Sequence, residues 1–199
     1  MIIYVETNFL MGIAKGQDPP AQELLQNTPS SLRLVMPSIC FVESLITLEQ
    51  EEKYNVEFLH KLDIQINQAG RDNSDNARLL LSLLEQSRTT FLERSNEVKE
   101  RFDIAFNRLA QKAEIITLNK DIFQETLNRP ILSKHIIDKI ILECIIYHAN
   151  LYPQEIKIFL SSNSKEFGRR EVTEILSNIG VQYLSQTQNF IGWLKSQPN

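Results

Sequence analysis

Three acidic residues lie among apolar neighbours, close to where strands and helices are expected to meet. Glu6 follows a β-forming run, residues 2–5, and so stands at the end of a predicted strand. Glu43 lies between two isoleucines on a predicted helix. Asp138 shares one side of its helix with four apolar residues, Ile141, Leu142, Ile145 and Ala149. An ionised carboxylate in such surroundings costs several kcal/mol unless it is paired or bound to a metal.

Each acid also has a structural interpretation when it is considered alone. Asp138 stands near the start of its helix, where the dipole favours an anion, and Glu43 suits a buried ion pair. The three together favour a shared site, because the carboxyl edge of a parallel sheet gathers ligand-binding groups. Clustered carboxylates repel, and Mg²⁺ or Mn²⁺ relieves that repulsion through oxygen ligands. Such a site supports metal-assisted hydrolysis of a phosphodiester.

An alternation of predicted strands and helices positions these acids. The predicted strands are residues 2–5, 33–36, 114–118, 156–160 and 181–184. The predicted helices around them are 8–15, about 19–26, one that opens after Pro37 with Ser38 as its N-cap, about 120–128, 135–149, 169–178 and 187–195. This order predicts an α/β fold with a mostly parallel sheet of about five strands and helices on both faces.

The middle of the chain differs from this alternation. Residues 49–112 contain no proline, only Gly70 as a glycine, and no convincing strand. Apolar residues recur there at three- and four-residue steps, so we expect a helix near 54–69 and a long or broken helix near 74–112. Residues 71–112 carry eight basic and seven acidic side chains, which argues against a simple basic clamp. Three roles of these central helices stay open: a cap packed on the sheet domain, an arm that forms a dimer, and an arch that admits only single strands.

Composition narrows the class of protein. The 199 residues fit one domain, with the helical region at about 52–112 as an insertion, and 42% hydrophobic with 23% charged residues is ordinary for a globular protein. No apolar run reaches the roughly 20 residues that span a bilayer, and we find no signal peptide. Cys40 and Cys144 are predicted buried thiols, so we expect a cytoplasmic protein with no membrane partner. The net charge of −4 argues against coating nucleic acid through bulk charge.

Four short motifs resemble those of the PIN-domain ribonucleases, a family that includes bacterial toxin nucleases. The motifs are Glu6-Thr7-Asn8 after the first strand, PSICFVESL with Glu43, HIIDKIILECI with Asp138, and FLSSNSKEF at residues 159–167. The resemblance covers the first 50 residues and about 113–195, but not the central helices. It implies a three-layer α/β/α PIN-like fold and a catalytic set of Glu6, Glu43, Asp138 and Asn163.

Two positions depart from the family pattern. The first acid is normally Asp, and the extra methylene of Glu6 moves its carboxylate by about 1.5 Å. The fourth acid is usually Asp where this chain has Asn163, whose neutral oxygen weakens a second metal site most. The resemblance implies Glu6, Glu43 and Asp138 as metal ligands, joined by Glu166 if its loop turns inward.

The resemblance also implies residues that orient the site. Asn8 orients the first acid by hydrogen bonding and also suits a helix N-cap, while Ser161 or Ser162 bonds a metal-bound water or a phosphate. A loop serine is more often structural when it is considered alone. Glu143 points away from Asp138 onto a polar strip. The three histidines show no metal-ligand or triad spacing: His60, His135 and His148.

Cleavage of RNA requires cations near the acids, because the phosphates must be held. The candidate nucleic-acid-binding residues are Lys134, Lys139, Lys165, Arg169 and Arg170. The alternative for the two adjacent arginines is a solvated surface pair.

We therefore predict a divalent-metal-dependent endoribonuclease that uses Mg²⁺ or Mn²⁺ on single-stranded RNA. The alternative is a catalytically weakened or inactive PIN-fold module for RNA binding or assembly, which Glu6 and Asn163 favour. A nucleotide- or metabolite-binding domain is a third class, although the sequence has no Gly-rich phosphate loop. If the chain is a toxin, an antitoxin protein is its expected partner, and a homodimer stays open.

Overall fold

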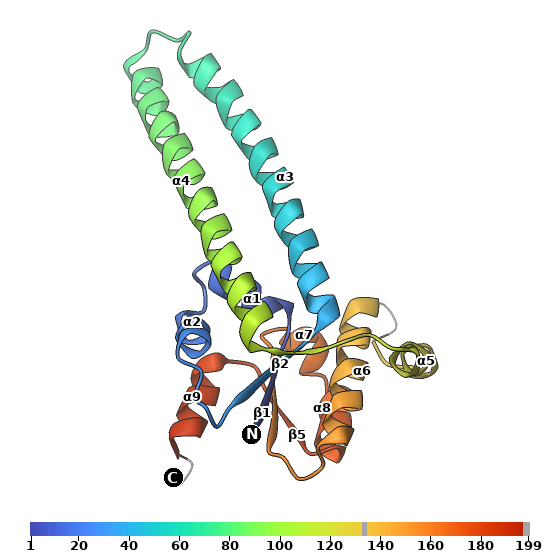
Figure 1. Ribbon diagram of the computed structural model, residues 1–199. Coiled ribbons are helices and arrows are strands. Elements are labelled where there is room, and N and C mark those ends of the chain that lie inside the picture. The colour runs from blue at the N-terminus through green and yellow to red at the C-terminus, as the bar shows by residue number, and fades with distance from the viewer. Residues whose placement is uncertain (133–134, 197–199) are drawn as a thin grey trace.

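In the computed structural model, which describes residues 1–132 and 135–196, two long helices project from an α/β body (Figure 1). The strands are β1 (Ile2–Val5), β2 (Arg33–Pro37), β3 (Glu114–Ile116), β4 (Lys157–Leu160) and β5 (Val181–Leu184). The helices are α1 (Thr7–Ala14), α2 (Pro19–Gln26), α3 (Ser38–Ala69), α4 (Asp75–Lys112), α5 (Lys120–Asn128), α6 (Ile136–Leu151), α7 (Ser164–Phe167), α8 (Arg170–Asn178) and α9 (Thr187–Ser196).

The sheet is parallel throughout, and its five strands in the described residues follow the order β3-β2-β1-β4-β5. Ile3 of the central strand pairs with Leu34 on one side and Ile158 on the other. All four residues of β1 are buried, as expected of a parallel strand covered on both faces. The predicted three-layer α/β/α fold is confirmed.

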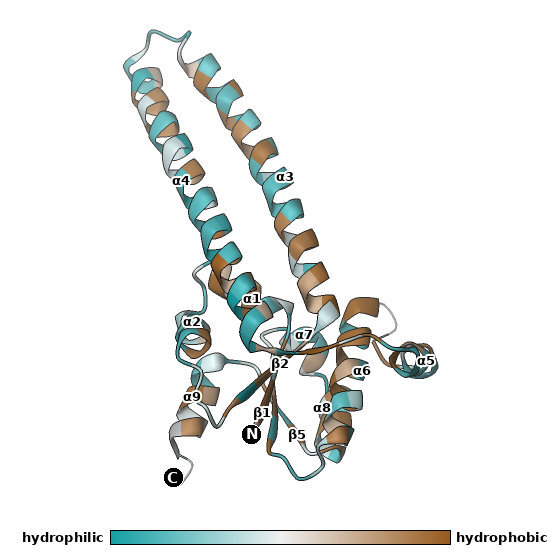
Figure 2. Cartoon of the chain, in the orientation of Figure 1, coloured by the Kyte–Doolittle hydropathy of each residue, from teal (hydrophilic) through white to brown (hydrophobic). Residues whose placement is uncertain are grey.

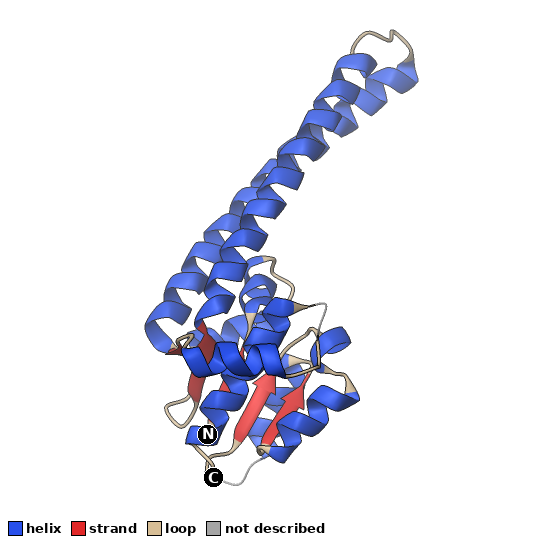
Figure 3. Cartoon of the chain, turned by 90° about the vertical axis from the view of Figure 1, so that its right-hand side faces the viewer, coloured by secondary structure: helices blue, strands red, loops and turns tan. Residues whose placement is uncertain are grey.

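Helices cover the two faces of the sheet. Figure 1 shows α2 and α9 on one side of the sheet, α6 and α8 on the other, and α5 packed outside α6, and Figure 3 shows the molecule from the side that α5 covers. The strands are largely hydrophobic (Figure 2). In the described part of the chain, no helix is long and apolar enough to cross a membrane. Cys40 and Cys144 are buried free thiols, as predicted.

The strand order reverses beside β1, and this reversal positions the candidate site. The chain passes from β1 to β2 on one side, whereas β4 and β5 extend the sheet on the other side. Ligands of open α/β sheets bind outside the carboxyl ends of the strands at such a switch point. The first residues beyond the carboxyl ends of β1 and β4 are Glu6 and Ser161.

The arm, which we define as α3 and α4, is more continuous than predicted. The helix expected after Pro37 and the helix expected near 54–69 are one helix of 32 residues, because no glycine or proline interrupts residues 38–69. The second arm helix is also unbroken and has 38 residues. The prediction that Ser38 caps the first helix is wrong, since Ser38 is already helical and Pro37 precedes it without a side-chain cap.

Side chains of α4 attach the arm to the body. Nε of Arg101 donates to the carbonyl oxygen of Ala14 at 2.9 Å. Nζ of Lys112 donates to the carbonyl oxygens of Leu25 and Gln26 at 3.0 and 3.1 Å. These carbonyls end α1 and α2, so the two cations satisfy acceptors that helix ends leave unpaired.

The remaining boundaries follow the sequence closely, with two exceptions. The third strand ends at Ile116, two residues earlier than expected, and the short helix α7 was not predicted. Residues 52–112 lie mostly within the arm, and their description as an insertion into a single domain of residues 1–199 stays a prediction about domain organisation.

Candidate active site

Glu6 lies buried at the junction of β1 and α1, with only 3% of its surface exposed. Oγ of Ser161 donates to its Oε1 at 2.8 Å, and the backbone N–H of Asn8 donates to its Oε2 at 2.8 Å. Burial raises the pKa of Glu6 to about 7, and the nearby charges of Glu43 and Asp138 act in the same direction. A carboxyl group with this pKa readily exchanges its proton for a cation near neutral pH.

Glu43 approaches this acid from the second turn of α3. Oγ1 of Thr7 donates a hydrogen bond to its Oε2, so the residue after Glu6 holds the second carboxylate. The sequence pattern suggested that Glu43 is surrounded by apolar residues, but one of them, Ile46, is 50% exposed to solvent. Glu43 therefore borders solvent while its carboxylate faces the end of β1.

Asp138 enters from the first turn of α6, and 18% of its side chain is exposed. Nδ2 of Asn163 donates to its Oδ1 at 3.2 Å, and Nδ1 of His135 lies 3.9 Å from its Oδ2. Burial raises the pKa of Asp138 to about 6, with the charge of Glu43 as the next cause.

A line of hydrogen bonds joins two of the three acids. Oγ of Ser161 donates to Glu6 and accepts from the backbone N–H of Asn163 at 3.1 Å, while the side chain of Asn163 donates to Asp138. The structure thus brings together Glu6, Asp138 and Asn163 through the loop after β4, and Glu43 joins them through Thr7.

Glu166 is buried and turned inward, but it faces cations. Its Oε2 lies 2.5 Å from Nη2 of Arg169, and its Oε1 lies 3.3 Å from Nε2 of His135. The charge of Glu166 contributes to the raised pKa of Asp138, so Glu166 lies near the other acids. Arg169, predicted to bind nucleic acid, is thus engaged with Glu166.

His135 is a residue of this site that sequence reasoning missed. It lies within 4 Å of both Asp138 and Glu166. The available signal was its position three residues before Asp138 on the same helix side. The sequence contains no second histidine at this spacing from an acid of the site, so it gave no reason to assign His135 to the site.

The predicted orienting residues differ in detail from those in the structure. Asn8 is exposed and contacts Glu6 through its backbone N–H, and Glu6 rather than Asn8 caps α1. Ser162 is exposed, whereas its neighbour Ser161 is buried against Glu6. The sequence could not separate two adjacent serines, because only the backbone path after β4 decides which one faces inward.

The predicted cations are divided between surface and interior. Lys165 and Arg170 are exposed, and Arg170 pairs with Glu174 at 2.6 Å. Lys139 is only 8% exposed, so it offers little of its side chain to a phosphate, and we leave it out of the nucleic-acid surface. Lys134 lies outside the described residues.

Two polar groups of α6 serve the packing of the body. Glu143, expected on a polar strip of α6, is buried and paired with Arg129 at the end of α5, which packs against α6. His148 is buried between the hydroxyl of Tyr4, at 2.9 Å, and a carboxylate oxygen of Glu114, at 3.0 Å. This Tyr-His-Glu line joins β1, α6 and β3, although the sequence spacing gave no sign of it.

The donor set suits a hard divalent cation. Glu6, Glu43 and Asp138 offer carboxylate oxygens, the ligand type that Mg²⁺ and Mn²⁺ prefer. Two of them carry raised pKa values, the effect of burying like charges without a compensating ion. Over residues 1–132 and 135–196, however, no group of three His, Cys, Asp or Glu side chains is already gathered around one ion position. The residues fit the cation in chemistry, and binding one requires the three carboxylates to move closer together.

The fold and these acids define a class of protein. A family model described as PIN domain matches residues 3–167, a range that contains every acid of the site. The chain belongs to the PIN domain family. PIN domains are generally nucleases and generally use Mg²⁺ or Mn²⁺.

Individual known proteins add little to this assignment. A solved structure of VapBC-1 from nontypeable Haemophilus influenzae is 15% identical, with 92% of this chain and 97% of that chain covered and a TM-score of 0.39. That likeness is too low to carry an argument. No curated protein matches the chain.

Proposed function

We propose that this chain is a divalent-metal-dependent endoribonuclease that hydrolyses phosphodiester bonds in single-stranded RNA. The observation that carries the proposal is the convergence of Glu6, Glu43 and Asp138, from three separate elements, at the switch point of the sheet. Membership of the PIN domain family supports it.

Glu6, Glu43 and Asp138 are the residues that would hold the ion. When bound, Mg²⁺ or Mn²⁺ supplies an activated water and neutralises charge on the phosphate. Ser161 and Asn163 keep the carboxylates of Glu6 and Asp138 oriented through the hydrogen bonds described above. The acidic groups release their protons as a cation binds, because the ligands must be ionised.

Glu166 and the nearby cations would complete the site. Glu166 becomes a metal ligand only if it leaves Arg169 and His135, so we assign it a supporting role at a second ion. Lys165, Arg169 and Arg170 border the loop after β4 and are the residues proposed to contact RNA phosphates.

Asp138→Asn is the variant that tests the proposal. It keeps the shape of the side chain and removes one charge from the ligand set, so cleavage of single-stranded RNA in Mn²⁺ should fall by at least about a hundredfold. Excess EDTA should abolish cleavage by the parent protein. Gel analysis of labelled RNA measures both effects.

Asp121→Asn is the matched control. Asp121 is the exposed first-turn acid of α5, so its loss should leave cleavage unchanged. Equal cleavage by the parent and the Asp138 variant would point to a contaminating nuclease and count against the proposal.

A second function is favoured by the amide of Asn163 and by the pairing of Glu166 with Arg169, because both reduce the charge available to a second ion. This function is an RNA-binding or assembly module with little or no catalysis. RNA binding without metal-dependent cleavage, in the same assays, would select it.

Three further features belong to the proposal. An antitoxin partner would be encoded by a small neighbouring gene, and its product should block cleavage. A homodimer would show twice the 23.0 kDa chain mass in light scattering. A cytoplasmic location would place the nuclease with its RNA substrate.

A further inference from the structure

A line of three hollows leads from the candidate site onto the arm. The first, of about 330 Å³, reaches the site at Asn8 and Ser162. It shares Lys15 and Gln17 with a second hollow of about 240 Å³, at the root of the arm. Because neighbouring hollows share lining residues, they lie next to one another along the surface.

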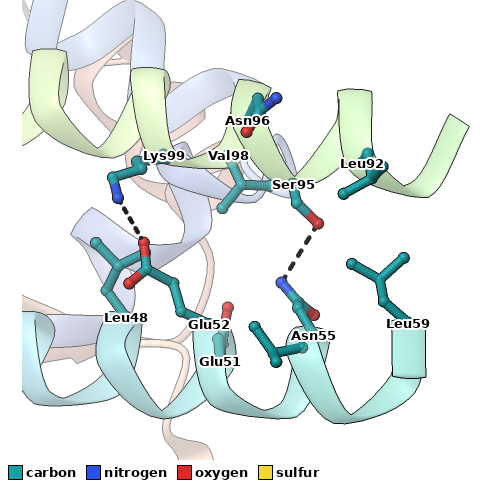
Figure 4. Close-up of a pocket in the computed structure, with 11 residues that line it drawn as sticks. Leu48, Glu51, Glu52, Asn55, Leu59, Leu92, Ser95, Asn96, Val98 and Lys99 are labelled. Atoms are coloured by element: carbon teal, nitrogen blue, oxygen red, sulfur yellow. Dashed lines mark hydrogen bonds and ion pairs between the residues drawn. The ribbon is translucent and has the colours of Figure 1, made fainter. Parts of the chain in front are cut away.

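The third hollow lies between α3 and α4 and has a volume of about 330 Å³ (Figure 4). Asn55 and Ser95 line both it and the second hollow, and Nδ2 of Asn55 lies 3.4 Å from Oγ of Ser95. Leucine side chains such as Leu59 and Leu92 face each other beside this polar pair (Figure 4). The path therefore ends in a mixed apolar and amide-lined space between the helices.

Most charges along this path are already balanced. Glu51 pairs with Lys15, and Glu52 pairs with Lys99 at 2.8 Å. Asp18 caps α2 and also accepts a hydrogen bond from Oγ1 of Thr187 at 2.6 Å. The two glutamates of the path thus have cationic partners, whereas Asp18 is held by hydrogen bonds alone.

Two side chains that line the second hollow, Arg94 and Tyr54, lack the partners that the acids of the path have. Arg94 is exposed and, within the described ranges of the chain, has no carboxylate within 4.0 Å. Tyr54 is 68% exposed, although burial of an aromatic ring against another group is strongly favourable. An exposed aromatic ring beside an unpaired cation, with amides and hydroxyls on either side, is the chemistry that binds unpaired nucleotides.

We propose that this line of hollows is a track for the single-stranded RNA that flanks the scissile phosphate. Tyr54 stacks on one base, Arg94 contacts a phosphate, and the amides of Gln17 and Asn55 contact base edges. The occupant is a single strand because stacking on Tyr54 requires a base that is not already stacked in a duplex. The inference rests on the proposed function for its substrate class.

The balance of charge on the track gives the RNA complex a characteristic salt response. Arg94 is the main cation without an acidic partner, so few counterions are released when the track fills. The track should therefore add only roughly 0.7 to the slope of log K against log salt, and loss of Arg94 should remove that contribution.

RNA binding without cleavage tests the track. A fluorescein-labelled single strand of about 16 nucleotides is titrated with Asp138→Asn protein in Mn²⁺, and anisotropy is recorded. Adding Tyr54→Ala should weaken binding about tenfold, and adding Arg94→Gln should weaken it about threefold with the smaller salt slope. Both positions are exposed, so circular dichroism should show an unchanged fold.

Tyr147→Ala and Arg78→Gln are the matched controls. Tyr147 is an exposed tyrosine on α6, and Arg78 is an exposed arginine near the tip of the arm, away from the hollows. Neither should change binding. Equal losses at control and track positions, or no loss at Tyr54 and Arg94, would overturn the inference.

The two proposals fail in different ways. Mn²⁺-dependent cleavage that does not depend on Tyr54 would leave the nuclease intact and remove the track. Tyr54-dependent binding without cleavage by the parent protein would keep the track and remove the enzyme. No RNA binding at all would remove the track, and an antitoxin that binds in a Tyr54-dependent manner would assign the surface to a protein.

Discussion

Glu6 has two roles in the structure. It is the first member of the acidic cluster, and its Oε2 accepts the backbone N–H of Asn8 at the start of α1. The helix terminus and the hydroxyl of Ser161 favour the ionised carboxylate, whereas burial opposes it. The resulting pKa of about 7 shows that burial prevails while no cation is bound.

The stability of the metal-free protein should therefore depend on Glu6. Its pKa is about 7 in the folded state against 4.5 ordinarily, so the folded state holds the proton more tightly. The free energy of unfolding then falls as pH rises from about 4.5 to about 7 and stays lowered above that range. Glu6→Gln should raise it by about 3 kcal/mol at pH 8 and hardly change it at pH 4.

Urea unfolding in EDTA at the two pH values measures this difference. Glu23→Gln, at an exposed acid of α2, is the control and should show no such dependence on pH. A Glu6→Gln effect of the same size at both pH values would show that the change acts through packing rather than charge.

Among the secondary-structure elements, the contact between α5 and α6 depends on one buried ion pair. Glu143 is almost completely buried, and Arg129 at the end of α5 supplies both of its hydrogen bonds. A buried pair adds little net stability, but removal of one partner leaves an uncompensated charge.

Arg129→Ala should lower the free energy of unfolding by about 3 kcal/mol. The double variant Arg129→Met with Glu143→Leu should recover most of that loss, because neither charge then remains buried. Chemical denaturation of both variants measures the difference. If the double variant were as unstable as the single one, packing by Arg129 would matter more than its charge.

The same elements show which features the sequence could predict. Strands and most helix ends followed from apolar runs and from Gly or Pro, and Gly16 does adopt a positive φ of 68° after α1. Helical periodicity places Glu43 and Asp138 beside apolar residues, and Glu6 directly follows an apolar strand, so the sequence indicated all three acids. The cover over Glu143 and the choice of Ser161 depend on contacts between distant segments, which periodicity does not describe. The single helix α3 was predicted as two helices, although no glycine or proline separates them.

In the whole molecule, the hydrophobic core draws on the arm only near its root. The arm residues of the main core are Cys40, Val98, Phe102, Ala105 and Leu109. Farther out, Leu62, Ala69 and Ala77 are buried but lie outside that core. Pairs such as Asp63 with Arg88, at 2.6 Å, hold the two helices to each other rather than to the body.

The outer arm should therefore be dispensable for folding of the body. Replacing residues 61–89 with a loop of about four Gly and Ser residues removes whole turns from both helices while keeping the root. The melting temperature should change by no more than about 5 °C, as followed by circular dichroism. A shortened chain that fails to fold would show that the outer arm is part of the cooperative unit.

The continuity of α3 has a mechanical consequence. Glu43 stands at the base of a helix that runs without glycine or proline to Ala69, about 39 Å away at 1.5 Å per residue. We expect such a helix to rotate about its first turns, which pack on the body, rather than to bend along its length. We therefore expect a sideways force on the outer end of α3 to reach Glu43 as a small rotation about the packed root of the helix.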